Sequence, residues 1–144
     1  MDKILVINGP NLNLLGKRDP AVYGSETYDD LCAYIKNSAE KLGFSGCEVF
    51  QSNHEGAIID EIHAADGNFC GIIINAGAYT HYSYAIRDAI DAVKLPVIEV
   101  HLSNVYSRDE FRQKSVIAPV CKGSIAGFGK ISYYAALCAM KELL

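Results

Sequence analysis

A chain of 144 residues is long enough to bury one hydrophobic core, so we expect a single domain over residues 1–144. Hydrophobic residues make up 50% of it and charged residues 21%, which is typical of globular proteins and excludes a disordered chain. The net charge of −4 speaks against nucleic acid as the main partner, and no apolar run reaches the ~18 residues of a membrane span, so we expect neither partner.

The first residues, Met1 to Lys3, lead directly into an apolar run and lack the layout of a signal peptide. The cysteines are scattered, odd in number and form no C-x-x-C pair: Cys32, Cys47, Cys70, Cys121 and Cys138. We therefore expect a cytoplasmic protein whose thiols are reduced and mostly buried.

Short apolar runs rich in β-branched residues alternate with helical patterns along the chain. The runs predict strands at residues 3–8, 47–51, 70–75 and 97–101, and a weaker one at 120–125. A capping box at Thr27 to Asp30 begins the first helix, which Gly43 ends, and Pro96 ends the third helix. Apolar residues at helical spacing indicate the core-facing sides: Leu31, Tyr34, Ile35 and Leu42; Ile58, Ile62 and Ala65; Ile86, Ala89, Ile90 and Val93; Ile131, Tyr134, Ala135 and Cys138.

This alternation predicts right-handed βαβ crossovers and therefore a parallel sheet that is covered on both faces. The run "GIIIN" at residues 71–75 is apolar without alternation, as expected of a strand buried on both sides. We predict an α/β protein with a three-layer flavodoxin-like fold, in which helices flank a five-stranded parallel sheet. Such folds bind ligands beyond the carboxyl ends of their strands.

The predicted strands end in polar residues. The first runs into Asn8, the third into Asn75 and a segment that contains His81, and the fourth contains Glu99 and His101. Each of these residues has a purely structural interpretation, such as a turn cap. Glu99 and His101 are two apart on one strand and therefore share a face, so the carboxylate is able to orient the imidazole and favour its protonated, acidic form.

The first strand is followed by an unusually long connection, "NGPNLNLLGKRDPAVYG" at residues 8–24, where two to six residues are common. Gly16 and Gly24 allow hinging and Pro20 stiffens the middle, so we interpret the segment as an active-site lid. Arg18 on this loop is able to lower the pKa of Tyr23 from about 10 by roughly 1–3 units, which would make the phenol a base. A surface tyrosine beside a solvated arginine is the alternative.

Together these groups suit a reaction in which a proton is removed next to a carbonyl and a leaving group is then lost. The tyrosinate is the base, the histidine is the acid, and the asparagine amides hold the oxyanion. The sequence therefore predicts a lyase. Ser103 and the segment after it add anion recognition, with Ser107 as a helix N-cap. Arg112 either faces the site or is a solvated helix charge.

Several segments together resemble the type II 3-dehydroquinate dehydratases. They are the long loop at 8–24, "SNHEG" at 52–56, "NAGAYTHYS" at 75–83, "EVHLSN" at 99–104 and "FRQKS" at 111–115. The resemblance covers essentially the whole chain in order. It implies an enzyme of the shikimate pathway that dehydrates 3-dehydroquinate to 3-dehydroshikimate, assembles from trimers into a dodecamer, and uses no metal or organic cofactor.

The resemblance also implies a role for individual residues. Tyr23 is the base that removes a C2 proton, Arg18 keeps it anionic, and Asn13 with a bound water stabilises the enolate. His101 protonates the departing C1 hydroxyl, with Glu99 behind it. Substrate contacts fall on Asn75, His81, Asp88, the backbone at Leu102 and Ser103, and Arg112, with Asp88 reaching a neighbouring subunit's site. Ser132 departs from the family's usual glycine, which we expect to affect helix packing and not the site.

Other readings of the same fold class fit less well. A receiver module needs acidic residues where Asn8 and Asn75 stand, and a nucleotide-binding module needs a phosphate loop after the first strand. The histidines lack the paired spacing of a zinc hydrolase. The type I dehydratases need a β/α barrel, for which 144 residues are too few. The remaining alternative is a non-catalytic flavodoxin-like module that binds a small molecule or phosphate.

Overall fold

The computed structural model of the chain describes residues 2–17, 21 and 25–144. Its sheet contains β1 (Lys3–Asn8), β2 (Gly46–Gln51), β3 (Gly71–Asn75), β4 (Val97–His101) and β5 (Gly123–Ala126). The strands are all parallel and lie in the order β2-β1-β3-β4-β5, which is the flavodoxin-like order. The predicted fold class is therefore confirmed.

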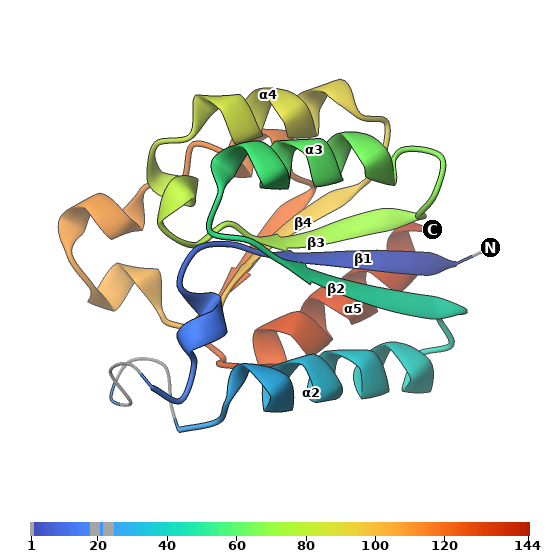
Figure 1. The fold of residues 1–144 in the computed structure, drawn as a ribbon, viewed down its shortest axis with the longest axis horizontal. Coiled ribbons are helices and arrows are strands. Elements are labelled where there is room, and N and C mark those ends of the chain that lie inside the picture. Colours follow the sequence, from blue (N-terminus) through green and yellow to red (C-terminus); the bar gives the residue numbers. More distant parts are fainter. Residues whose placement is uncertain (1, 18–20, 22–24) are drawn as a thin grey trace.

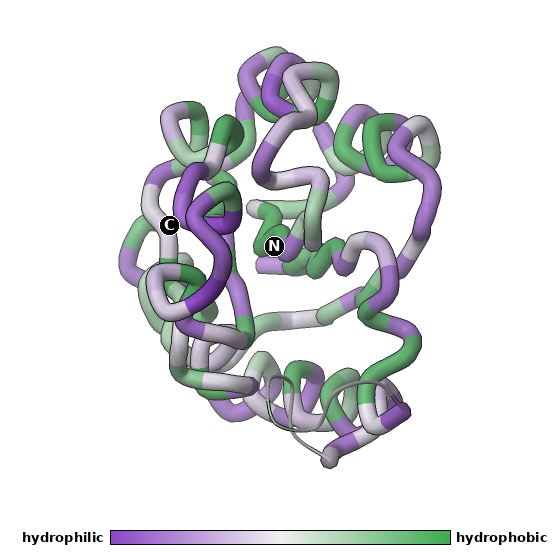
Figure 2. The backbone as a smooth tube through the Cα atoms, turned by 90° about the vertical axis from the view of Figure 1, so that its left-hand side faces the viewer, coloured by the Kyte–Doolittle hydropathy of each residue, from purple (hydrophilic) through white to green (hydrophobic). Residues whose placement is uncertain are grey.

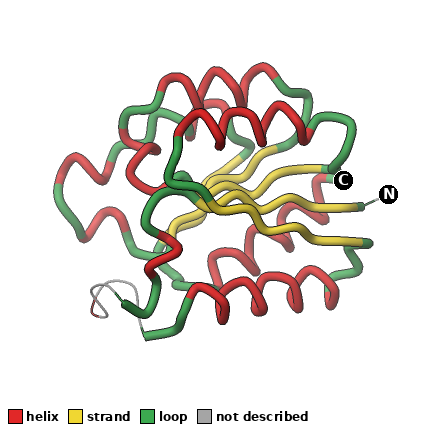
Figure 3. The backbone as a smooth tube through the Cα atoms, viewed as in Figure 1, coloured by secondary structure: helices red, strands yellow, loops and turns green. Residues whose placement is uncertain are grey.

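Two pairs of helices cover the two faces of the sheet (Figures 1 and 3). Helices α2 (Tyr28–Lys41) and α5 (Ile131–Leu143) lie on one face, and α3 (Glu55–Ala65) and α4 (Tyr84–Ala92) lie on the other. Short 3-10 helices follow the strands: η1 (Leu12–Leu14), η2 (Gly77–His81), η3 (Val105–Ser107), η4 (Glu110–Gln113) and η5 (Ala118–Val120). Among the described residues, no helix combines the length and the apolar character that a membrane crossing requires.

The core is divided by the sheet because successive strand residues point to opposite faces. On β1, Ile4 and Val6 pack beneath α2 and α5, whereas Leu5 and Ile7 pack beneath α3 and α4. Hydrophobic and hydrophilic residues alternate along the helices, as expected of helices with one buried side (Figure 2). The capping box of α2 is present, with the Thr27 hydroxyl accepting from the Asp30 amide at 3.1 Å.

Helix α5 turns a different side to the sheet from the one that the sequence predicted. Ile131 and Tyr134 are exposed, and the fully buried side chains are those of Ser132, Tyr133, Ala136, Leu137 and Met140. The helix is apolar on most of its circumference, so hydrophobic spacing alone did not distinguish its two sides. Tyr133 lies on the buried side because its hydroxyl has hydrogen-bond partners there, the side chains of Asn8 and Asn75 at the ends of β1 and β3.

Two element boundaries differ from the prediction by more than one residue. The segment predicted as a strand at 120–125 begins as η5, where Pro119 near the helix start has no amide hydrogen to give to a sheet, and β5 starts only at Gly123. Helix α4 ends at Ala92, since Val93 is already extended. The cysteines are free, as predicted, but they are partly rather than mostly buried.

The turn after β1 brings two strand ends into close backbone contact. The Gly9 amide donates to the Asn75 carbonyl oxygen at 2.7 Å. A Cβ atom at Gly9 would lie 2.5 Å from the carbonyl oxygen of Ala76, closer than real Cβ contacts allow. Gly77 completes the contact with a φ of 60° beside Pro10, a conformation that favours glycine. Only glycine at position 9 lets the loops after β1 and β3 lie this close.

We expect Gly9→Ala to lower the free energy of unfolding by about 1–3 kcal/mol, because the backbone must move to accept the methyl group. Urea-induced unfolding at matched protein concentration measures the change. Gly56→Ala is the control, since nothing lies within 4 Å of its Cβ position on α3 and alanine is the better helix former. Equal stability of the two variants would contradict the close approach.

Candidate active site

The carboxyl ends of β1, β3 and β4 converge, as the sequence predicted. Asn8 and Asn75 are direct register partners on β1 and β3, and β4 ends beside them at His101. A small cavity of about 100 Å³ lies at this edge. It is lined by Pro10, Asn11, Leu12, Asn75, Gly77, Ala78, His81, His101, Leu102, Ser103, Val105, Arg108 and Arg112.

Two larger hollows adjoin the small cavity. One of about 650 Å³ shares Leu102, Ser103 and Arg108 with it. The other, of about 600 Å³, shares His101, Val105 and Arg112 with it and also reaches Glu99. Small-molecule sites are commonly 300–1,000 Å³, so the space around the strand ends is of the right size for a metabolite.

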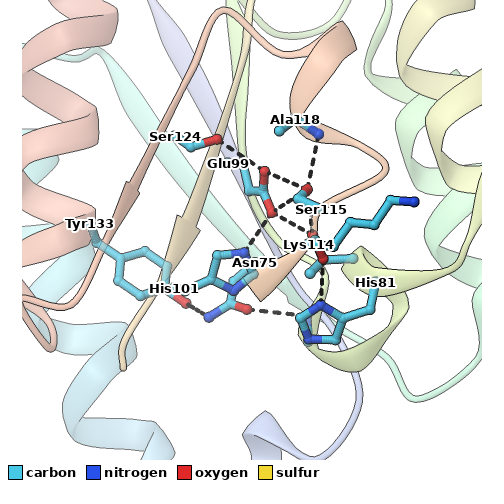
Figure 4. A network of polar contacts seen from close by, with 11 residues as sticks. Asn75, His81, Glu99, His101, Lys114, Ser115, Ala118, Ser124 and Tyr133 are labelled. Carbon is cyan, nitrogen blue, oxygen red and sulfur yellow. Dashed lines mark hydrogen bonds and ion pairs between the residues drawn. The ribbon is translucent and has the colours of Figure 1, made fainter. Parts of the chain in front are cut away.

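Glu99 and His101 form the ion pair that the sequence predicted (Figure 4). The imidazole Nε2 lies 2.6 Å from Oε2 of Glu99, whose side chain is only 1% exposed. A carboxylate accepts but does not donate, so Nε2 carries the proton of this hydrogen bond. The other ring nitrogen, Nδ1, has no hydrogen-bond partner among the described residues, and His101 lines the cavity.

The environment of Glu99 keeps its carboxylate ionised. Burial by itself raises the pKa of this group, but hydrogen bonds from His101, Thr80 and Ser115 outweigh burial and hold the pKa below its ordinary value. The carboxylate therefore stays charged at neutral pH and accepts the hydrogen bond from Nε2 of His101. This is the arrangement that a histidine acid needs.

Asn75 belongs to a buried network that the sequence did not predict. Its amide Nδ2 donates to the Tyr133 hydroxyl at 3.0 Å, and that hydroxyl donates to Oδ1 of Asn8 at 2.6 Å. Oδ1 of Asn75 accepts from the Gly77 amide at 3.2 Å. The network fixes the orientation of the Asn75 amide at the wall of the cavity. Tyr133 on α5 therefore supports the site. Its neighbour in the sequence is Ser132, which we expected to affect helix packing and not the site.

His81 and Arg112 lie together at the cavity. His81 Nδ1 donates to the Lys114 carbonyl oxygen at 2.8 Å, and partial burial lowers the pKa of this imidazole. The Arg112 guanidinium lies over the Phe111 ring at 4.7 Å, and its buried Nε has no hydrogen-bond partner within the described part of the chain. Of the two interpretations that the sequence left open for Arg112, the structure favours the one that faces the site.

Leu102 and Ser103 follow β4 directly and line the cavity. The Leu102 carbonyl accepts from the Gly129 amide at 2.9 Å, and the Ser103 hydroxyl accepts from Nη1 of Arg108 at 3.5 Å. Ser107 does not cap a helix. Its hydroxyl donates to the Asn104 carbonyl at 2.8 Å, and the short η4 begins after Asp109 instead, so this prediction is wrong.

Four of the predicted residues lie apart from this cluster or outside the described structure. Asn13 is exposed on η1 and accepts from Nε2 of Gln51 at 3.3 Å, whereas its neighbour Asn11 lines the cavity. Asp88 is exposed on α4 and lines none of the hollows at the strand ends. Arg18 and Tyr23 lie outside the described residues, as does part of the proposed lid.

Sequence reasoning missed several residues that hold the site together: Thr80, Ser115, Ser124, Tyr133 and Arg108. The hydroxyl residues are separated along the chain and have no motif spacing. The available signal was indirect, since a carboxylate in an apolar strand requires several donors. Among the described residues, no group of three His, Cys, Asp or Glu side chains is arranged to hold a metal ion.

Comparisons with known proteins identify the family of this chain. The family model described as "Dehydroquinase class II" matches residues 2–141. The 3-dehydroquinate dehydratase of Caldicellulosiruptor saccharolyticus is 62% identical, covering 100% of this chain and 99% of the relative. That of Bacillus cytotoxicus is 58% identical, covering 100% of this chain and 98% of the relative.

Solved structures give the same result. The type II dehydroquinase from Butyrivibrio crossotus superposes with a TM-score of 0.94 at 52% identity and covers 96% of this chain and 97% of its own. The type II dehydroquinase from Propionibacterium acnes also has a TM-score of 0.94, at 41% identity, and covers 99% of this chain and 97% of its own.

We expect Tyr133→Phe to lower the free energy of unfolding by about 1–3 kcal/mol, because it leaves polar atoms of Asn8 and Asn75 buried without a partner. Tyr82→Phe is the matched control, since Tyr82 is 59% exposed and its hydroxyl stays in reach of water. Chemical denaturation compares the two. An equal loss for the Tyr82 variant would contradict the network.

Proposed function

This chain belongs to the class II dehydroquinase family, and we propose that it dehydrates 3-dehydroquinate to 3-dehydroshikimate in the shikimate pathway. The observation that carries the proposal is the buried Glu99–His101 pair beside a cavity at the strand ends of a chain that matches a dehydratase over its whole length. This pair supplies an acid, which a dehydration requires for its departing hydroxyl.

In the proposed mechanism Tyr23 removes a proton from C2, and the electron pair of the C–H bond moves to the C3 carbonyl oxygen as an enolate. The enolate collapses to form the C1–C2 double bond, and the C1–O bond breaks as His101 gives a proton to the departing hydroxyl. One water leaves. Arg18 keeps Tyr23 anionic, and Asn13 with a bound water stabilises the enolate, roles that rest on the family resemblance.

The described side chains support the acid step. With Nε2 held on Glu99, Nδ1 of the protonated imidazole is the donor that faces the cavity. The charge of Glu99 stabilises the imidazolium before the reaction, and this stabilisation costs no rearrangement during it.

Substrate binding is proposed for the polar wall of the cavity: Asn75, His81, Leu102, Ser103 and Arg112. Arg112 suits the carboxylate of the substrate, because a guanidinium pairs with a carboxylate through two hydrogen bonds. Its buried Nε has no hydrogen-bond partner among the described residues and only a distant ion pair with Asp109 at 3.9 Å. His81, donating through Nδ1 to a carbonyl, offers Nε2 to a substrate hydroxyl.

We also propose that the chain works in the cytoplasm as a dodecamer of trimers, in which Asp88 of one subunit reaches the site of its neighbour. The exposed position of Asp88 on α4 supports such a role. Mass measurement in solution tests the assembly. A non-catalytic binding module is the rival, and it predicts binding of the substrate without turnover.

We expect the purified protein to convert 3-dehydroquinate to an ultraviolet-absorbing conjugated enone without added metal or cofactor. Tyr23→Phe should lower kcat by about 10²–10⁴-fold, which is the usual contribution of a general base. Tyr82→Phe, at an exposed tyrosine that lines no cavity at the strand ends, is the matched control. Failure of the wild-type protein to turn over, or unchanged turnover by Tyr23→Phe, would contradict the mechanism.

His101→Ala should also lower kcat by about 10²–10⁴-fold while KM changes little, because proton donation to the leaving hydroxyl matters only in the transition state. Steady-state kinetics separate the two constants. A large rise in KM with kcat intact would instead assign His101 to substrate binding.

A further inference from the structure

The Glu99 carboxylate is enclosed by side chains from separate parts of the fold (Figure 4). The Thr80 hydroxyl on η2 donates to Oε2, and the Ser115 hydroxyl lies 2.9 Å from both carboxylate oxygens. The Ser124 hydroxyl on β5 donates to Oε1 at 3.0 Å. Together with Nε2 of His101, these groups match the roughly four acceptor positions of a carboxylate.

Each of these hydroxyls has a single hydrogen, and the carboxylate accepts it. Ser115 Oγ accepts from the Ala118 amide at 3.0 Å, so its own hydrogen is free for Glu99. If Glu99 were protonated, its own hydrogen would occupy a position to which a neighbouring group already donates. Two donors would then face each other with no acceptor between them. The hydroxyls therefore stabilise the charged form of Glu99 by hydrogen bonding, independently of His101.

The same geometry fixes the histidine. Oε2 accepts from Thr80 and from Nε2 of His101, so rotation of the carboxylate away from the imidazole would break hydrogen bonds on both of its oxygens. The imidazole is thereby held with Nε2 protonated and with Nδ1 left for the substrate. The backbone reinforces the arrangement, because the Val116 amide donates to the Thr80 carbonyl at 2.8 Å and ties η2 to the Ser115 segment.

From this geometry we infer that Thr80, Ser115 and Ser124 are positioning residues of the dehydration, whose hydroxyls hold Glu99 ionised and oriented so that His101 delivers its proton through Nδ1. The inference rests on the proposed function. None of the three needs to touch the substrate. Their contribution reaches the reaction through the charge and orientation of the Glu99–His101 pair.

Other titratable or charged groups also face this pair. His81 on η2, Arg112 on η4 and the adjoining Lys114 lie around the two hollows that His101 lines. Cys121 follows η5 near Glu99, and burial, followed by the Glu99 charge, raises the pKa of its thiol to about 12, so it stays neutral. None of these groups donates a hydrogen bond to Glu99, so removing a hydroxyl changes the carboxylate more directly than it changes them.

The test compares Thr80→Val with Thr80→Ser in the full-length enzyme. Valine keeps the shape and removes the donor, whereas serine keeps the donor. We expect Thr80→Val to lower kcat by roughly three- to tenfold with little change in KM, since a hydrogen bond to a charged group is lost. Thr80→Ser should retain most of the activity. Ser38→Ala, which removes a buried hydroxyl on α2, is the control and should leave kcat unchanged.

The titration of Glu99 itself distinguishes positioning from packing. The hydroxyls lower the pKa of Glu99, so removing one raises it, and carbon-13 NMR of the Glu99 carboxyl should show protonation at higher pH in Thr80→Val than in the wild type. A packing defect alone would lower kcat without moving this titration. Wild-type kcat, or a lower kcat with an unmoved Glu99 titration, overturns the inference.

Two further measurements keep the result decisive. Ser124 is exposed, so Ser124→Ala should fold even where Thr80→Val does not, and the same upward shift of the Glu99 titration is expected of it. If the wild-type protein does not dehydrate 3-dehydroquinate, the proposed function fails. Nitrogen-15 NMR of the His101 ring then tests the positioning separately: neutral His101 should carry its proton on Nε2, and a proton on Nδ1 would overturn it.

Discussion

A negative charge placed inside the sheet is the constraint on which this site depends. Glu99 sits on β4 between apolar neighbours and is almost completely buried, so its charge requires donors from the surrounding elements. Those donors come from η2, the segment before η5, β5 and the end of β4 itself. Segments that are far apart in the sequence must therefore meet at one point, and the hollows at the strand ends lie around it.

The parallel sheet supplies the rest of the geometry. Its order brings the carboxyl ends of β1, β3 and β4 next to one another, and a glycine at position 9 lets the following loops approach closely. The paired amides of Asn8 and Asn75 are then held from below by the Tyr133 hydroxyl on α5. Two buried networks of hydrogen bonds therefore fix the cavity wall. One joins Asn8, Asn75 and Tyr133, and the other surrounds the Glu99 carboxylate.

Much of this was predictable from the sequence, because it depends on local pattern. The strands, the capping box at Thr27 and the pairing of Glu99 with His101 follow from periodicity and from residue spacing along one element. The buried side of α5 and the hydroxyls around Glu99 depend instead on long-range contacts. A helix apolar on most sides, and serines with no fixed spacing, do not reveal which tertiary neighbours they meet.

The energetics suggest why such a costly arrangement is kept at the strand ends. Burying an ion pair seldom stabilises a fold, because removing both charges from water costs about as much as their attraction returns. A pair of apolar residues at positions 99 and 101 would satisfy β4 as well, as Val97, Ile98 and Val100 do. Fold stability therefore does not explain why β4 carries Glu99 and His101, or why hydroxyl donors from other elements surround Glu99. What the arrangement provides is an ionised carboxylate held against the imidazole of His101, a residue that lines the cavity, and this is what the proposed proton transfer requires and folding does not.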